Sequence, residues 1–283
     1  MNESMMNTVL LFAIPYFVLT MLMELLVGRL RKNQTYALKD ALASLSMGLG
    51  NMLVGFLSIS FVAGVLFFFY RFAVLSPGTA WWSWGLLFIG VDLCWYFDHR
   101  MGHESRFFWA SHVVHHSSRH YHLATGLRQT WTGKPIAVFF YIPLALLGFH
   151  PGMILVMISL HRIAGYWVHT EHIPKLGYLE YVFCTPSNHR VHHGVEKKYL
   201  DRNYGGIFIV WDRLFGTFQE EEESPTYGLT KNIESFNPFV IAFHEWVAVL
   251  RDMQNANGPR EALYYIFGSP TGVARLRGNS LQP

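Results

Sequence analysis

Long apolar stretches constrain the fold of this 283-residue chain more than any other feature. Residues 8–27 and 41–72 form two such runs, and residues 80–97 form a third that opens with several tryptophans. Each run is long enough to cross a hydrocarbon core of about 30 Å as a helix. Only 14% of the residues are charged, whereas a soluble domain usually has about 25%. The pattern predicts an all-α integral membrane protein.

Two further apolar runs, 135–149 and 153–168, flank a turn at His150-Pro-Gly152. The first is short for a full crossing, so we expect a helical hairpin that enters the bilayer and returns to the same side. The expected fold is a helical bundle of three or four spans plus this hairpin, with a histidine-rich cytoplasmic cap. We expect one domain over residues 1–250, with its histidine-rich region at 92–218, and a mobile or surface-lying tail over 251–283.

Four cations follow the first apolar run, at Arg29, Arg31, Lys32 and Lys39. The positive-inside rule places this loop in the cytoplasm. Counting spans from there puts the turn at residues 76–79 outside and the histidine region on the cytoplasmic face. We therefore expect an integral membrane protein, which in a bacterium would lie in the inner membrane. The net charge of +3 is too small to indicate nucleic-acid binding.

Eight histidines fall into three tight clusters, one spaced by four residues at 99–103 and two of the form H-x-x-H-H at 112–116 and 189–193. On a helix, residues four apart share a face, and each H-x-x-H-H places its imidazoles within an arc of about 100°. Neutral imidazole is a metal ligand that leaves positions open for water, oxygen or substrate. Otherwise each imidazole would need its own partner in a largely apolar chain. The clusters predict a site for two metal ions.

Other histidines adjoin these clusters. His169 ends the expected hairpin on the polar side and is a ninth candidate ligand, whereas His161 either faces the site or packs in the core. We expect His120, His122 and His172 to be neighbours of the site or surface residues, and His150 and His244 to be structural. The predicted ligands are His99, His103, His112, His115, His116, His169, His189, His192 and His193.

Ligand imidazoles commonly donate their second N–H to a carboxylate. Asp92 precedes His99 by seven residues and lies inside an apolar run, where an unpaired carboxylate is costly. We therefore expect Asp92 to accept a hydrogen bond from His99 or from the second cluster. Glu104 and Glu171 each follow a predicted ligand and either orient it or form an interfacial salt bridge. We expect Asp98 to face away.

The number of histidines separates the possible metal centres. A zinc protease needs H-E-x-x-H, which His103-Glu-Ser-Arg-Phe107 does not complete. Catalytic zinc usually takes three protein ligands and haem takes one or two. Two iron ions with an all-nitrogen shell fit the count better, with Asn188 and Asn203 as weaker oxygen donors.

The leading functional hypothesis, which also rests on a family resemblance, is an O2-dependent hydroxylation of a lipid C–H bond. The same centre would also support a lipid desaturase. A non-catalytic membrane sensor of metal or lipid is the alternative from another class. We expect the lipid in an apolar slot between residues 80–97 and the hairpin at 135–168. Electron donor and oligomeric state stay open.

Beyond spacing, the chain resembles the fatty acid hydroxylase/sterol desaturase superfamily over roughly residues 92–243, and within it the branch of alkylglycerol monooxygenase and its bacterial relatives. The motifs that carry the resemblance are His99-Arg-Met-Gly-His-Glu104, Trp109-Ala-Ser-His-Val-Val-His-His-Ser-Ser118, Leu127-Arg-Gln129, Trp167-Val-His-Thr-Glu171, Thr185-Pro-Ser-Asn-His-Arg-Val-His-His-Gly194, Asn203-Tyr-Gly-Gly206, Trp211-Asp-Arg-Leu-Phe-Gly-Thr217 and Tyr227-Gly-Leu-Thr230.

This resemblance implies a non-haem di-iron centre, O2 as the oxidant and a lipid that reaches the site from the bilayer. It implies a role for Glu104 in activity and an external reductant, which is a pterin in the animal members of the branch. The chain departs from the branch at Asn188, which replaces a usual histidine, at His122, which replaces asparagine, and at Asp98, which replaces an aromatic residue.

Overall fold

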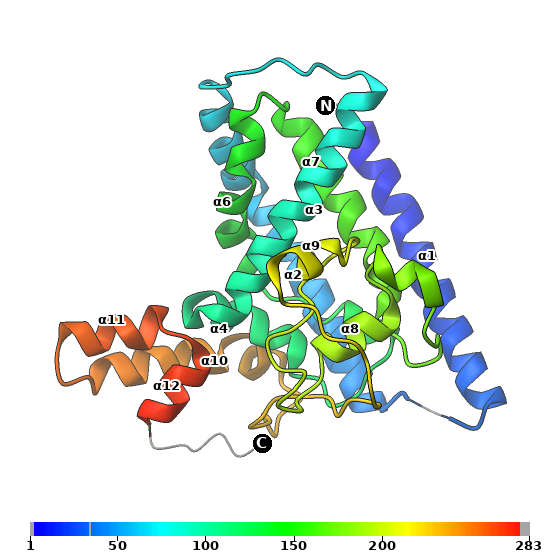
Figure 1. Cartoon of the computed structure of the whole chain (residues 1–283), viewed down its shortest axis with the longest axis vertical. Coiled ribbons are helices and arrows are strands. Elements are labelled where there is room, and N and C mark those ends of the chain that lie inside the picture. Colours follow the sequence, from blue (N-terminus) through cyan, green and yellow to red (C-terminus); the bar gives the residue numbers. More distant parts are fainter. Residues whose placement is uncertain (1–2, 34, 278–283) are drawn as a thin grey trace.

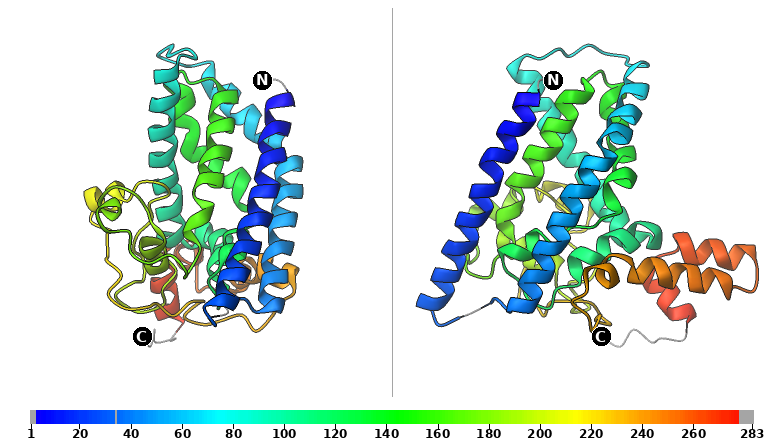
Figure 2. Two further views of the ribbon diagram at one scale, coloured as in Figure 1. Left: turned by 90° about the vertical axis from the view of Figure 1, so that its right-hand side faces the viewer. Right: turned by 180° about the vertical axis from the view of Figure 1, so that it is seen from behind.

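A computed structural model describes residues 3–33 and 35–277 and shows a helical protein (Figure 1). Three long helices, α1 (Glu3–Leu30), α2 (Leu38–Tyr70) and α3 (Trp81–Glu104), run alongside the hairpin of α6 (Gly133–Leu146) and α7 (Pro151–Ala164). The shorter elements gather mainly toward one end of this bundle (Figure 2). They are α4 (Arg106–His116), α5 (Leu123–Gly126), η1 (Tyr166–Val168), η2 (Gly177–Tyr181), α8 (Pro186–His192), α9 (Val210–Phe215), α10 (Pro238–Gln254), α11 (Pro259–Phe267) and α12 (Pro270–Leu276).

Three stretches of the described helices are long and apolar enough to cross a membrane, at Leu11–Leu30, Leu38–Tyr70 and Pro151–Val168. The predicted helical membrane fold is therefore confirmed, but the set of spans differs from the expected one. Helix α3 is not in this set because Asp92, Asp98 and several tryptophans lower its mean hydropathy. The second arm of the hairpin, α7 with η1, is instead long and apolar enough to cross a membrane.

The α6–α7 hairpin forms and returns, as predicted, and its turn lies beside the α2–α3 connection. Val74 N donates to Leu146 O over 2.9 Å. Gly148 in this turn has φ +88, and a Cβ there would collide with the carbonyl of Leu75. Since a left-handed backbone and this close approach both favour glycine, the turn is fixed by sequence. The hairpin packs on α2 and α3 through a core that includes Leu66, Leu87, Val91, Tyr141, Leu144 and Ile154.

The basic loop after α1 lies at the histidine end of the bundle. Arg31 Nη1 donates to the carbonyl of His172 over 3.0 Å, and Leu123 N donates to Glu24 Oε2 over 2.7 Å. These bonds connect α1 to the segments that precede or follow predicted ligands. The basic loop and the histidine clusters therefore share one end of the molecule, in agreement with the span count.

The C-terminal region that was expected to form a mobile or surface-lying tail contains regular helices. Helix α10 runs through Arg251, and α11 and α12 follow it. Helices α10 and α11 are held by the buried guanidinium of Arg106, which pairs with Glu245 at 2.7 Å and with Asp252 at 2.6 Å. Arg106 also donates to the carbonyl of Tyr265. The individual helices are short, so sequence alone gave no sign of this long-range anchor. Residues 278–283 of the expected tail lie outside the described residues.

Replacing Arg106 with Met should release this region, because breaking a buried ion pair by removing one partner costs about 3–5 kcal/mol. We expect faster proteolytic cleavage between residues 254 and 276 in detergent-solubilised protein. Arg119 is a matched control, since its pair with Glu234 is exposed and long at 3.4 Å. Equal cleavage of the Arg106→Met and Arg119→Met variants would contradict the anchoring role.

Candidate metal centre

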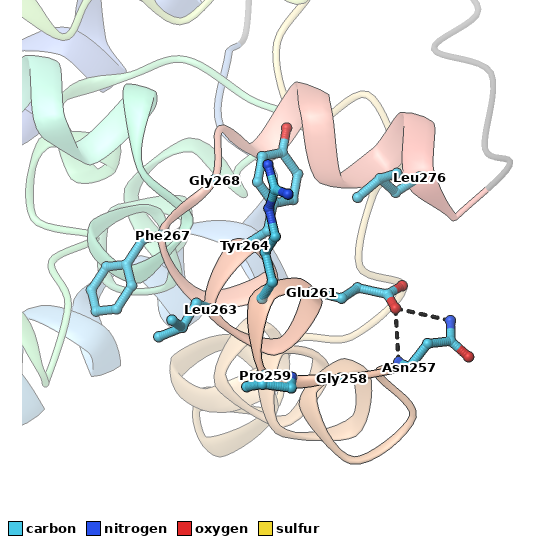
Figure 3. A pocket seen from close by; sticks show the side chains of 10 residues that line it. Asn257, Gly258, Pro259, Glu261, Leu263, Tyr264, Phe267, Gly268 and Leu276 are labelled. Atoms are coloured by element: carbon cyan, nitrogen blue, oxygen red, sulfur yellow. Dashed lines mark hydrogen bonds between the residues drawn. The ribbon is translucent and has the colours of Figure 1, made fainter.

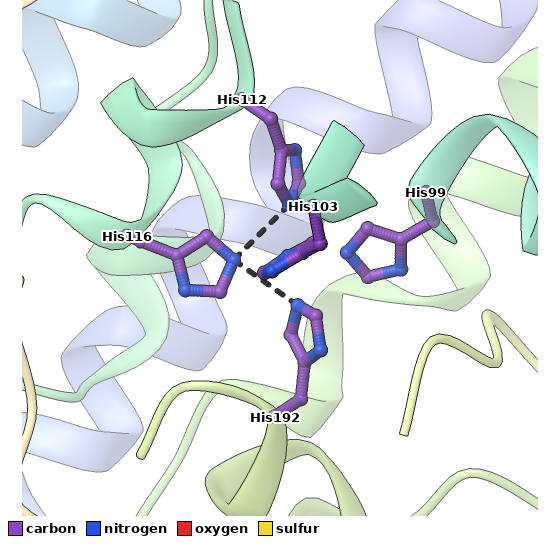
Figure 4. A group of neighbouring side chains, drawn as sticks. All are labelled: His99, His103, His112, His116 and His192. Atoms are coloured by element: carbon purple, nitrogen blue, oxygen red, sulfur yellow. Dashed lines mark hydrogen bonds between the residues drawn. The ribbon is translucent and has the colours of Figure 1, made fainter. Parts of the chain in front are cut away.

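The structure brings all nine predicted ligand histidines together in two adjoining groups. The ligand nitrogens within each group lie within 4.8 Å of one another. Figure 4 shows the imidazoles of the first group pointing toward a common centre. The first group is His99, His103, His112, His116 and His192, and the second group is His115, His169, His189 and His193.

Helical spacing explains how the clusters divide. Residues four apart differ by about 40° around a helix, whereas residues three apart lie about 60° to the other side. The pairs His112/His116 and His189/His193 therefore each stay within one group. The intervening His115 and His192 point into the opposite group. One H-x-x-H-H motif thus supplies ligands to both groups.

Hydrogen bonds on the outer side of the rings fix their orientation. His99 Nδ1 lies 2.7 Å from the carbonyl of Tyr204, and His192 Nδ1 lies 2.9 Å from that of Arg202. In the second group, His169 Nδ1 lies 3.0 Å from the carbonyl of Tyr166. A carbonyl only accepts, so each Nδ1 carries the proton and each Nε2 presents a lone pair inward.

The inner nitrogens then approach closely. His115 Nε2 and His169 Nε2 are 3.2 Å apart, although the Nδ1 of each faces a backbone carbonyl, that of Arg128 at 3.3 Å and that of Tyr166. Two lone pairs at this distance repel unless a cation lies between them. Two imidazole nitrogens bound at a right angle, each about 2.1 Å from one ion, would be about 3.0 Å apart. The donor set and its spacing therefore fit a metal ion.

Burial favours the neutral form of several of these rings. Desolvation lowers the pKa of His116, His192 and His193 well below the ordinary value, and neighbouring imidazoles lower it further. Desolvation also lowers the pKa of His169, to about 4. A neutral imidazole is the form that binds a metal. In the first group, His99 Nε2 and His103 Nε2 are buried with no hydrogen-bond partner in the described part of the chain, as expected of ligand atoms.

Asp92 has a different partner from the one expected. It is fully buried and accepts from His161 Nε2 at 2.6 Å, not from His99 or the second cluster. It also accepts from Ile207 N at 2.8 Å and Trp211 Nε1 at 2.8 Å. Seven residues along a helix put Asp92 and His99 on one face but two turns apart, about 10 Å. Asp92 therefore positions the segment around residues 207–211, and His161 lies outside both groups.

Glu104 is exposed and pairs with Arg100 over 2.8 Å, so its carboxylate joins neither histidine group. The role in activity that the resemblance implies for it stays a prediction. Glu171 is half-buried and also lies outside both groups. Asp98 is likewise half-buried and outside them.

The other polar candidates have structural contacts. His122 is buried and stacks on Tyr36 with ring centroids 4.0 Å apart, and His120 is exposed. His150 caps the N-terminus of α7, and His244 Nδ1 bonds to the carbonyl of Ile241. The side-chain amides of Asn188 and Asn203 donate to backbone carbonyls, of Phe183 and Asn188 respectively. His172 lies at the basic loop.

Asp212 is a supporting residue that the sequence did not reveal. Its buried carboxylate accepts from Tyr204 N and Gly205 N, each at 2.7 Å, and from Thr217 Oγ1 at 2.6 Å. It thereby fixes the Tyr204 carbonyl that orients His99. The available signal was a lone carboxylate within Trp211-Asp-Arg-Leu-Phe-Gly-Thr217.

A groove at the C-terminal helices is separate from this centre. It has a volume of about 870 Å³ and is lined by residues 257–276 of α11, α12 and the turn before them. Figure 3 shows Glu261 bonded to Asn257 at its rim. No histidine lines it, so it shares no residue with either histidine group.

Removing one ligand from either group should lower the bound metal to about half, because each group can hold one ion. We expect this for His192→Ala in the first group and for His189→Ala in the second, measured by elemental analysis of the purified protein. His120→Ala, in an exposed position, should keep its full metal content. Complete loss of metal from both ligand variants would show that the groups act as one cooperative site.

Asp92→Asn should lower stability by about 2–3 kcal/mol, because hydrogen bonds to a charged acceptor are lost and an amide N–H₂ then faces N–H donors. The measurement is the thermal inactivation temperature in detergent, compared with Glu104→Gln at its exposed position. Metal content close to that of the parent protein is expected at low temperature. An unchanged inactivation temperature would refute the positioning role of Asp92.

Comparison with known proteins agrees with this geometry. A sequence model of the fatty acid hydroxylase family matches residues 84–217, which contain all nine histidines. The alkylglycerol monooxygenases of Homo sapiens and Xenopus tropicalis are 40% and 38% identical over 262 and 261 residues, 91% of this chain and 58% of theirs. An ornithine lipid hydroxylase of Rhizobium tropici is 29% identical over 148 residues, 49% of this chain and 43% of its own.

The chain thus spans less than two thirds of the length of the alkylglycerol monooxygenases that it resembles. No solved structure matches it. The shared region carries the complete set of converging histidines, in the spacing and order described above. The chain belongs to the fatty acid hydroxylase superfamily.

Proposed function

We propose that this protein is a membrane-bound oxygenase that uses two iron ions and O2 to hydroxylate a C–H bond of a lipid. The observation that carries the proposal is the inward lone pairs of His115 and His169, 3.2 Å apart in an all-imidazole group beside a second such group. Relatives named for monooxygenation of alkylglycerol and hydroxylation of ornithine lipid support a lipid substrate.

Iron held by the two groups would supply oxygen activation, which amino-acid side chains do not perform. The chain itself contributes orientation and a water-poor site. The carbonyls of Tyr204, Arg202 and Tyr166 accept hydrogen bonds from the Nδ1 atoms of three ligand rings. The Nε2 atom of each of these rings is therefore unprotonated and can donate its lone pair to a metal ion. Most of the nine rings are nearly inaccessible to solvent, which limits the access of water to a reactive centre.

The expected location of the centre is the cytoplasmic face of the membrane, the inner membrane if the source is bacterial. The bond between Arg31 and the carbonyl of His172 supports this orientation, since it puts the basic loop at the histidine end. Tetrahydrobiopterin or another external reductant would supply the electrons. Among the described residues, no feature favours a desaturase or a non-catalytic sensor over the oxygenase.

The function can be tested with protein in lipid nanodiscs, loaded with ferrous iron and given isotopically labelled O2. The substrates are a 1-O-alkylglycerol and an ornithine lipid, with tetrahydrobiopterin or a chemical reductant in separate arms. We expect a lipid product with one labelled oxygen atom, or an aldehyde derived from it, by mass spectrometry.

The control is His189→Ala, which removes a predicted ligand and should reduce turnover by at least about 1000-fold, as loss of an essential catalytic group does. A product that has lost two hydrogens without gaining oxygen would instead establish a desaturase. Oxygen consumption that does not depend on lipid would contradict the proposal.

A further inference from the structure

Glu24 is the one acidic residue within the first apolar run, and the proposed chemistry leaves it without a role. Its carboxylate is buried in α1 and accepts from Leu123 N at 2.7 Å, Tyr36 Oη at 2.5 Å and Thr170 Oγ1 at 2.5 Å. Thr170 follows the predicted ligand His169. The carboxylate thus ties a membrane helix to the side chain next to a ligand of the second histidine group.

A cavity of about 220 Å³ lies beside this contact. One wall is the inner face of α1, and the other is formed by α5, η1 and the residues after it. Its lining is predominantly apolar. This volume is below the range of about 300–1,000 Å³ usual for a site that encloses a whole small molecule. The lining residues are Tyr16, Thr20, Met23, Glu24, Val27, Leu123, Tyr166, Trp167, Thr170, His172 and Ile173.

The position of α1 directs this cavity toward the bilayer. Helix α1 contains a candidate membrane span and stands at the side of the bundle (Figure 2). The residues on its outer face, including Leu19, Leu22 and Leu26, are more than half exposed, as expected for a helix in contact with lipid. The cavity is partly open, so an alkyl chain could lie partly inside it and partly in the membrane.

Two buried polar atoms at the cavity point to a ligand with oxygen atoms. Tyr166 is 3% exposed, and its hydroxyl lies near Thr20 but has no hydrogen-bond partner of good geometry within residues 3–33 and 35–277. His172 Nε2 is also buried and lacks a partner in the same ranges. An unpaired buried polar atom costs free energy. A hydroxyl, ether or ester oxygen of a lipid would satisfy either atom.

The same turn connects the cavity to the metal centre. Tyr166 lines the cavity, and its carbonyl orients the ring of His169 over 3.0 Å. A lipid bound here would therefore lie against the backbone that holds a predicted ligand. By contrast, the expected slot between α3 and the hairpin is occupied by core side chains such as Leu87, Val91 and Leu144.

We propose that this cavity between α1 and η1 binds the alkyl chain of the lipid substrate, with the lipid's glycerol or headgroup oxygens reaching Tyr166 and His172. The inference rests on the proposed function, because it identifies the bound lipid as the substrate. It assigns α1 a binding role in addition to membrane anchoring.

The test uses a 1-O-alkylglycerol with a diazirine in its alkyl chain, photolysed in nanodiscs with the iron-loaded protein. We expect labelled peptides from α1 and residues 166–173, suppressed by excess unlabelled alkylglycerol. Val27→Trp fills the cavity, whereas Leu26→Trp on the exposed face is its matched control. Excluding about five chain atoms should weaken binding about tenfold in Val27→Trp only.

Iron content and the size-exclusion profile report whether each variant is folded. If Val27→Trp does not fold, Ile173→Trp replaces it, because it fills the cavity from the opposite wall. Equal competed labelling in the cavity-filling and control variants would overturn the inference. An unchanged KM for a long-chain alkylglycerol in the folded Val27→Trp variant would also overturn the inference about the cavity, but it would leave the proposed function intact. Competed, Val27-dependent labelling in a parent protein that oxidises no lipid would contradict the function but retain the cavity as a lipid site.

Discussion

The structure depends on one electrostatic constraint, which is that nine imidazoles must face one another in a water-poor interior. Burial lowers the pKa of rings such as His192 and His193, so protonation does not relieve the contact of their inner nitrogens. Backbone carbonyls accept from several outer nitrogens and direct those lone pairs inward. A shared cation turns this repulsion into binding, which couples metal affinity to the stability of the whole histidine end.

The positions of the ligand rings also depend on buried carboxylates that hold the loops around the centre. Asp212 fixes the amide groups of Tyr204 and Gly205, and the Tyr204 carbonyl in turn fixes His99. Asp92 holds the next segment through Ile207 and Trp211. These carboxylates act through backbone position and do not contact the inner nitrogens, so their substitution should affect geometry and stability before it affects the identity of the metal.

The membrane helices contribute more than anchoring. Placing the histidines at one end of the bundle allows the centre to adjoin both an aqueous phase and the apolar helices. The tie between Glu24 and Thr170 places α1 against the second group, while the anchor of Arg106 holds α10 and α11 beside α4. Long-range polar contacts of this kind fix elements whose apolar faces alone would permit several arrangements.

The sequence by itself determined the apolar helices, the hairpin and the nine histidines that converge, because chain length, hydropathy and helical spacing act within one or two turns. The tertiary structure decided how the histidines divide, since His115 and His192 join the groups opposite to their neighbours. It also decided the partner of Asp92, the packing of α10–α12 and the cavity beside α1. Each of these depends on residues far apart in sequence, such as His161 with Asp92, 69 positions apart, and Arg106 with Tyr265, 159 positions apart. The path of the loops that brings such residues together is set by the sum of all packing contacts, and local periodicity does not contain it.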